Sequence, residues 1–166
     1  MNIALTGPSK RKEEWKSKVA SGCNILEFDF GSEIPEHDVL VDLAFDDYPE
    51  RILAYAQLSA PLLLSCVKIQ LIGVLAHFGI REKRNVYGIN ALPTFINREK
   101  SEMSLAFESE KAAAETLCTS LGVKPEWVND RVGLVTPRIL FMIINEAYYN
   151  VQEGTANKAD IDTGMK

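Results

Sequence analysis

The sequence predicts an α/β protein, in which a doubly wound, mainly parallel sheet is followed by a segment that contains only helices. Short apolar runs alternate with helical stretches up to about residue 130, a pattern typical of a parallel sheet with helices on its faces. Some of these runs are almost continuously apolar, as strands are when both faces of the sheet are covered. Beyond residue 130 the pattern is helical alone.

The strands and helices of the first part are expected in alternation. The expected strands are residues 2–6, 24–30, 38–45, 61–66 and 85–89, with a short sixth strand at 126–129. The expected helices are residues 9–20, 49–60, 69–78 and 108–121. About seven residues join the second and third strands, whereas a crossover between parallel neighbours needs about a dozen. These two strands therefore either lie apart in the sheet or share a shortened crossover.

The second part begins with a helix over residues 137–153. Pro137 suits the first turn, and Gly154 suits the position after the last one. Residues 139–144 are apolar all round, which predicts a helix buried on every side. Asn157 is expected to begin another helix, with Asp160 in its first turn. We therefore expect two domains, residues 1–130 and 131–166.

Composition excludes several classes of partner. The net charge of −5 disfavours nucleic acid. No apolar run reaches the roughly 18 residues that span a bilayer, so no membrane association is expected. Cys23, Cys66 and Cys118 are far apart and odd in number, as reduced thiols of a cytoplasmic protein would be. His37 and His77 have no partner at metal-ligand spacing, and no metal site is expected.

The stretch from Gly133 to Lys166 carries a series of matches to one family. The matching residues are Gly133, Leu134, Val135 and Arg138, then Asn145-Glu146-Ala147, Glu153-Gly154, Asp160-Ile161-Asp162 and Met165-Lys166. In this order they resemble the start of the helical C-terminal domain of the 3-hydroxyacyl-CoA dehydrogenase family, with Pro137 where that family usually has Asn. The resemblance implies a shortened Rossmann-like sheet followed by the first helices of an all-α dimerisation domain. Because the family's domain continues past this point, the chain is expected to be either shortened or part of a longer protein.

The first part resembles the same family more loosely. Asp42, Ala44 and Asp46 fall where the family has residues close to the nicotinamide of NAD. Asp29 falls where an acidic residue binds the adenosine ribose, and its alternative is a solvated strand end. The resemblance thus implies NAD as cofactor, acyl-CoA as substrate, and Gly7, Asp29 and Asp46 as cofactor-binding positions.

The turn after the first strand departs from the dinucleotide-binding pattern G-x-G-x-x-G. It reads Gly7-Pro8-Ser9-Lys10-Arg11-Lys12, so that Ser9 and Lys12 replace the second and third glycines. Lys12 is expected to hold the helix off the sheet, and Pro8 removes an amide donor. Two alternatives remain for Ser9 to Lys12: a different phosphate grip at a helix N-terminus, or a solvated basic turn capped by Ser9.

The catalytic positions are also altered. The family's proton acceptor is a histidine in a Gly-x-His-Phe-x-Asn-Pro segment, and the best match here is Gly88 to Pro93, which places Asn90 at the histidine. A carboxamide cannot take up a proton near neutral pH. Asn145 and Ser65 match two further family positions near the reacting centre. Asn145 has an alternative as a buried amide bonded to the backbone or to Arg138.

Three hypotheses follow. The first is a non-catalytic member of the family that keeps the fold and the dimer contact. The second is an active, shortened 3-hydroxybutyryl-CoA dehydrogenase, with His77, Glu99 or Glu102 as relocated base. The third is an interaction protein that dimerises through residues 137–153.

Overall fold

The computed structural model describes residues 1–165, which fall into two compact units: unit 1, residues 1–134, and unit 2, residues 135–165. Each unit is described by itself. Lys166, the last residue of the family match, lies outside the described residues.

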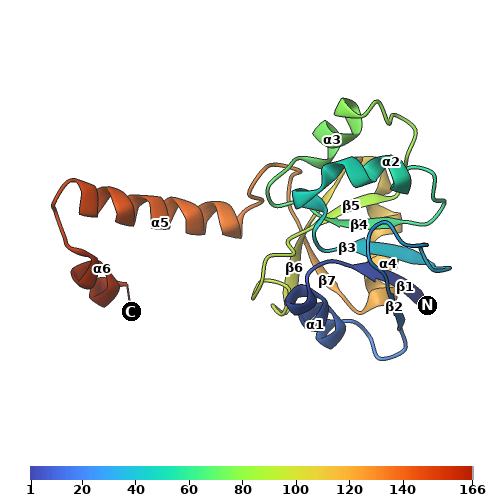
Figure 1. Cartoon of the computed structure of the whole chain (residues 1–166), viewed down its shortest axis with the longest axis horizontal. Helices are drawn as coiled ribbons and strands as arrows, with labels where there is room; N and C mark the ends of the chain where they lie inside the picture. The colour runs from blue at the N-terminus through green and yellow to red at the C-terminus, as the bar shows by residue number, and fades with distance from the viewer. Residues whose placement is uncertain (166) are drawn as a thin grey trace. The chain divides into compact units, whose positions relative to one another are not determined.

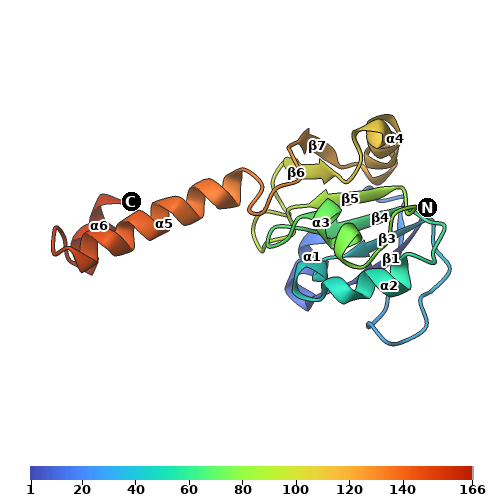
Figure 2. The same cartoon turned by 90° about the horizontal axis from the view of Figure 1, so that it is seen from above.

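Unit 1 is built on one sheet of seven strands (Figures 1 and 2). The strand order is β2-β1-β3-β4-β5-β6-β7, and every neighbouring pair is parallel except β5 and β6. The strands are β1 Asn2–Thr6, β2 Asn24–Glu27, β3 Val39–Asp42, β4 Leu62–Ser65, β5 Val86–Ile89, β6 Lys100–Leu105 and β7 Lys124–Trp127. The doubly wound α/β class expected from the sequence is confirmed.

The short connection between β2 and β3 is explained by the strand order. The two strands lie on opposite sides of β1, with Ile3 paired to Ile25 on one side and to Val39 on the other. The chain therefore passes from one side of β1 to the other without a crossover helix. Of the two alternatives left by the sequence, the structure has the one in which these strands lie apart.

Helices cover both faces of the sheet. On one face, α1 (Ser9–Lys18) and α4 (Lys111–Leu121) pack through Trp15, Ala114, Cys118 and Leu121. On the other face, α2 (Ile52–Tyr55) and α3 (Leu71–His77) pack through Ile52, Tyr55, Leu71 and Leu75. Short 3-10 turns, η1 Phe45–Asp47, η2 Pro49–Arg51 and η3 Glu108–Glu110, precede α2 and α4. Two apolar layers thus enclose the sheet.

Two elements of unit 1 differ from the prediction. Strand β6 was not expected, because four of the six residues in its sequence Lys-Ser-Glu-Met-Ser-Leu are polar; Ser101 and Ser104 are buried in it along with Met103. The helix expected over residues 49–60 is only η2 and the four residues of α2. A short segment is enough there, because β3 and β4 are neighbours in the sheet.

Unit 2 consists of α5 (Thr136–Gln152) and α6 (Lys158–Gly164), drawn in orange and red in Figure 1. Gly154 follows α5 with φ +72°, a conformation that favours glycine. Asn157 begins α6 as expected: its side chain accepts from the Asp160 amide at 3.0 Å, and the Asp160 carboxylate accepts from the Asn157 amide at 3.2 Å.

The prediction that residues 139–144 are buried on every side is wrong for this chain alone. All six side chains are exposed, from 39% for Leu140 to 65% for Met142. The apolar pattern predicted that other residues would bury these side chains, but none of the described residues does so. None of the helices within residues 1–165 combines the length and the apolar character needed to cross a bilayer.

Candidate functional site

The candidate site is the carboxyl edge of the parallel strands, where β1 and β3 diverge. In doubly wound sheets ligands bind at this point, because the chain leaves the two strands in opposite directions and opens a crevice. Gly7 follows β1 with φ +136°, and a Cβ added there would lie 2.9 Å from the Cβ of Leu43. Glycine is therefore required for the turn after β1 to pack on the turn after β3.

Arg11 connects these two turns. Its side chain projects from α1 and the residue is only 9% exposed. Its Nη1 donates to the Leu43 carbonyl at 2.5 Å and lies 3.9 Å from Oδ1 of Asp46. Asp46 is itself buried, and its Oδ1 has no hydrogen-bond partner. A guanidinium and a carboxylate thus face each other across the mouth of the crevice.

Lys12, at the place of the third glycine, turns toward β2. Its Nζ pairs with Oε2 of Glu27 at 2.5 Å, and Lys16 pairs with the other oxygen of the same carboxylate. The hydrogen bonds from these two ammonium groups lower the pKa of Glu27 below its usual value. Because Lys12 points sideways, α1 still packs on the sheet through Trp15, and the expectation that Lys12 would hold the helix away is wrong.

The basic first turn of α1 does not gather around an anion. The N-cap is Pro8, without a side-chain cap, so the expected cap by Ser9 is absent. Arg11 and Lys12 are directed at Asp46 and Glu27, which leaves Ser9 and Lys10 exposed at the end of the helix. The alternative of a phosphate grip by all four residues is therefore not supported.

Asp42 organises the other side of the crevice. Its carboxylate is fully buried and accepts three hydrogen bonds: from the Ala44 amide at 2.8 Å, Arg51 Nη1 at 3.0 Å and the Tyr55 hydroxyl at 2.8 Å. Burial, with the nearby carboxylate, raises the pKa of the Tyr55 hydroxyl above its ordinary value. Asp42 therefore fixes the segment after β3.

Arg51 lies over two aromatic rings. Its guanidinium carbon lies 4.6 Å from the ring centre of Phe30 and 4.4 Å from that of Tyr48. Sequence reasoning missed Arg51, Tyr55 and Phe30, because nothing in their spacing shows that segments 20 residues apart meet here. Asp29, next to Phe30, has an exposed side chain at this rim.

The expected catalytic positions Ser65 and Asn90 lie at the same edge of the sheet. Ser65 ends β4 beside Ile89, is fully buried, and its Oγ has no hydrogen-bond partner. Asn90 is buried after β5. Its backbone N–H donates to the backbone carbonyl of Glu102, and its side-chain Oδ1 accepts from the backbone N–H of Leu92 at 3.3 Å. That bond makes the Asn90 side chain part of a local turn.

Asn145 lies in unit 2, on α5, and its side chain is exposed. The alternative of a buried amide is therefore wrong within this chain. The structure brings Gly7, Asp46, Ser65 and Asn90 to one edge of unit 1, whereas Asn145 belongs to the other unit.

Among the residues considered as relocated bases, Glu102 lies at this edge of the sheet, because its backbone carbonyl accepts from the backbone amide of Asn90 at 2.9 Å. His77 is exposed at the end of α3, edge-on to Phe78. Glu99 is exposed and paired with Lys124 at 2.8 Å, while Glu102 is on β6. The buried Cys66 is no nucleophile, because burial raises the pKa of its thiol to about 12. Among residues 1–165 no group of His, Cys, Asp and Glu side chains could hold a metal ion.

Comparison with known proteins identifies the fold. No protein-family model and no curated protein sequence matches this chain. Among solved structures, (S)-3-hydroxybutyryl-CoA dehydrogenase from Ralstonia eutropha matches 99% of this chain and 76% of its own, with a TM-score of 0.72 and 18% identity. The 3-hydroxyacyl-CoA dehydrogenase of Archaeoglobus fulgidus matches 98% of this chain and 67% of its own, with a TM-score of 0.71 and 15% identity.

A third structure is 5-formyl-3-hydroxy-2-methylpyridine 4-carboxylic acid 5-dehydrogenase, described as an NAD⁺-dependent dismutase. It matches 98% of this chain and 68% of its own, with a TM-score of 0.69 and 16% identity. Likeness at such identities concerns the backbone alone. The chain has a 3-hydroxyacyl-CoA dehydrogenase-like fold.

Proposed function

We propose that this chain is a non-catalytic protein on the 3-hydroxyacyl-CoA dehydrogenase fold, and that it acts as a homodimer formed through unit 2. The observation that carries the first half of the proposal is the buried Arg11, joined to Leu43 and facing Asp46 where a dinucleotide would cross the sheet. A cytoplasmic place beside fatty-acid metabolism belongs to the same proposal, on the basis of the fold.

The residues of the crevice do not fit a pyrophosphate. Pro8 has no amide to donate, and a side chain stands at each of the two positions where glycine lets the backbone approach the phosphates. The Arg11 guanidinium is directed to a carbonyl and a carboxylate, so its charge is not available to an anion. We therefore assign no hydride transfer to NAD at this edge.

The histidine that the resemblance gives to the proton-transfer step is replaced as well. Asn90 stands where the resemblance places histidine, and its carbonyl oxygen is already held by the Leu92 amide. Asp42 and Asp46 are the buried carboxylates of this edge, and each faces a guanidinium: Arg51 lies 3.0 Å from Asp42 and Arg11 lies 3.9 Å from Asp46.

Calorimetry and an activity assay on the full chain test this half of the proposal. We expect titration with NADH to give no saturable heat, and acetoacetyl-CoA with NADH to give no turnover that grows with protein concentration. A parallel titration with acetyl-CoA asks whether acyl-CoA affinity has survived separately. Turnover proportional to protein would contradict the proposal outright.

The second half of the proposal rests on the apolar side chains of α5. Large apolar residues are exposed around the whole helix: Ile139, Leu140, Phe141, Met142, Ile143, Ile144, Tyr148 and Tyr149. Burying one such side chain contributes about 1.5–3 kcal/mol, so leaving all of them in water is costly. A continuous exposed surface made of this many large apolar side chains is typical of a protein interface.

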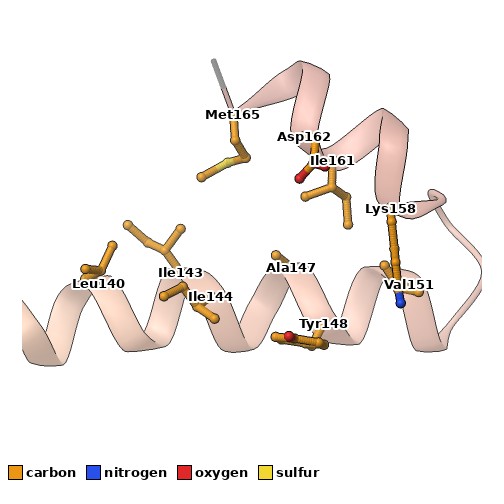
Figure 3. Close-up of a pocket in the computed structure, with 10 residues that line it drawn as sticks. All are labelled: Leu140, Ile143, Ile144, Ala147, Tyr148, Val151, Lys158, Ile161, Asp162 and Met165. Atoms are coloured by element: carbon orange, nitrogen blue, oxygen red, sulfur yellow. The ribbon is translucent and has the colours of Figure 1, made fainter.

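Figure 3 shows how α6 covers only part of this surface. Ile161 and Met165 of α6 face Leu140, Ile143 and Ala147 of α5, and the space between them is an apolar groove of about 380 Å³. Lys158 and Asp162 are the charged residues among those that line it. An acid and a base on one groove make it self-complementary, since in a two-fold dimer each copy can present Lys158 to Asp162 of the other. We therefore assign a second copy as its occupant.

Light scattering across a range of protein concentrations tests the dimer. Ile143→Glu places a charge among the apolar residues and should shift the protein to monomer by at least tenfold in dissociation constant, about 1.4 kcal/mol. Gln152→Glu, at the exposed end of the same helix, is the matched control and should remain a dimer. A parent protein that is monomeric at every concentration would remove this half of the proposal.

The alternative function is an active, NAD-dependent 3-hydroxybutyryl-CoA dehydrogenase with a relocated base. It is favoured by the dehydrogenase names of the similar structures, one of which is described as NAD⁺-dependent. His77 is its most plausible base by chemistry. If the assay above gives turnover, His77→Ala should abolish it; a variant as fast as the parent would exclude this residue.

A further inference from the structure

We propose that Arg51 is a specificity-determining residue: its guanidinium covers the rings of Phe30 and Tyr48, here called the stacking slot, and thereby excludes a planar nucleobase from the candidate site. This inference deepens the proposed function and rests on it, since both require that the crevice does not accept a dinucleotide. It assigns to the Arg51 side chain the exclusion of a nucleobase from the β2 side of the crevice.

The topology places the slot at the crevice. Strands β2 and β3 flank β1 on either side, and their carboxyl ends lie at the same edge. Phe30 follows β2, whereas Tyr48 and Arg51 follow β3. When Arg51 stacks on Phe30 at 4.6 Å, the two segments are joined across the end of β1. The stack therefore bridges the crevice at the strand that leads into Gly7.

The guanidinium is held firmly, and the rings are open to solvent. Arg51 is bonded to the buried Asp42 at 3.0 Å, and its side chain is only 12% exposed. Tyr55 shares the same carboxylate oxygen and meets the Phe30 ring edge-on at 6.1 Å. Phe30 and Tyr48 themselves are 45% and 48% exposed. The Arg51 guanidinium is therefore held in place, while the two aromatic rings are accessible to solvent.

The planar shape of the Arg51 guanidinium explains why it excludes a nucleobase. A guanidinium is planar and stacks on aromatic faces, and a nucleobase uses such faces in the same way. The guanidinium carbon lies 4.6 Å from the ring centre of Phe30 and 4.4 Å from that of Tyr48, so a nucleobase cannot stack on the ring faces that Arg51 covers. Without Arg51, the rings and the edge of the sheet leave a place for a base.

The experiment compares binding of the fluorescent nucleotide etheno-AMP, followed by anisotropy, in four proteins. The test variant is Arg51→Ala combined with Asp42→Asn, so that no buried carboxylate loses its partner. Arg84→Ala is the matched control, because Arg84 also stacks on an aromatic ring, Phe107 at 4.3 Å, but precedes β5 at the opposite edge of the sheet. The fourth protein adds Phe30→Leu to the test variant.

We expect the double variant to bind etheno-AMP about tenfold more tightly than the parent, within the range of one base–aromatic stack. The control should bind like the parent, and Phe30→Leu should remove the gain. A double variant that melts cooperatively and binds no better than the parent would overturn the inference, as would an equal gain in the control. Neither result touches the proposed function, which fails separately if the parent binds NADH.

Discussion

The two units of this chain satisfy their apolar residues in opposite ways. In unit 1, both faces of the sheet are covered, and side chains such as Leu5, Leu40 and Leu63 are fully buried. In unit 2, Pro137 is the only buried residue among 135–165, although α5 is one of the most apolar segments of the sequence. The difference teaches that unit 1 covers its own apolar residues, whereas unit 2 leaves the apolar residues of α5 exposed.

The units also differ in how they treat charge. Unit 1 buries the carboxylates of Asp42 and Asp46 beside Arg51 and Arg11. Such pairs contribute little net stability, but removing one partner is costly because the other is left uncompensated. The charged groups of unit 2 stay at its surface, as in the capping pair of Asn157 and Asp160. Substitutions should therefore be severe in unit 1 and mild in unit 2.

The largest effect is expected from Asp42→Ala. The substitution leaves Arg51 and the Tyr55 hydroxyl without their shared acceptor, which should lower the free energy of unfolding by about 3 kcal/mol. Urea unfolding followed by tryptophan fluorescence measures it, because Trp15 and Trp127 both belong to unit 1. Asp47→Ala removes an exposed carboxylate paired with Lys68 and should cost below about 1 kcal/mol. Equal losses would show that the buried network adds nothing.

A smaller loss is expected from Gly88→Ala in the centre of β5. A Cβ there would lie 2.3 Å from the Cys66 sulfur and 2.4 Å from the Ser104 hydroxyl, so the packed core must shift. Overpacking of this kind costs about 2 kcal/mol. Gly73→Ala is the control, since its Cβ would find 3.7 Å of clearance within α3 and should stabilise the helix slightly. If Gly88→Ala were neutral, unit 1 would be looser than its burial indicates.

Asn157→Ala should act on unit 2 alone. It removes the side chain that accepts from the Asp160 amide, and the loss of such a cap costs about 1 kcal/mol of helix stability. Amide hydrogen exchange should become faster in residues 158–164 and stay unchanged in unit 1. Faster exchange in β1 or β3 would mean that the two units do not unfold independently.

The smallest effect is expected from the pH dependence of Glu27. Lys12 and Lys16 hold the pKa of this carboxyl below its unfolded value of 4.5. Because the folded pKa is the lower one, the stabilisation is present above pH 4.5 and is lost as the pH falls through the folded pKa. Glu27→Gln should remove that part of the acid dependence, measured by unfolding at pH 5 and pH 3. An unchanged acid dependence would mean that the exposed pair is screened.

The sequence was most informative where local pattern and tertiary environment agree. The almost continuous apolar runs at 38–45 and 61–66 predicted buried strands, and Asn157 predicted the start of α6. It failed where the environment decides: four of the six residues of β6 are polar, yet the strand lies inside the sheet between β5 and β7. Its serines are acceptable there because the backbone, rather than side-chain hydrophobicity, joins it to its neighbours.

The candidate site divides in the same way. The departure of Gly7 to Lys12 from the glycine pattern, and the asparagine at position 90 where the resemblance places a histidine, could be read from the residues alone, since both concern the identity of a side chain at a known spacing. The contacts that Arg11 and Arg51 make at this edge could not be predicted from the sequence. Arg11 meets Leu43 across 32 residues, and Arg51 meets Phe30 across 21, and no local pattern encodes such contacts.

The sequence by itself therefore determined the α/β class and showed which residues stand at Gly7 to Lys12 and at Asn90, because strand and helix periodicity and residue identity are local properties. Only the tertiary structure decided that two arginines reach across the carboxyl edge of the sheet and that α5 leaves its apolar side chains exposed. Both depend on which distant segments the strand order brings together, and on how much surface the rest of the chain has left to cover.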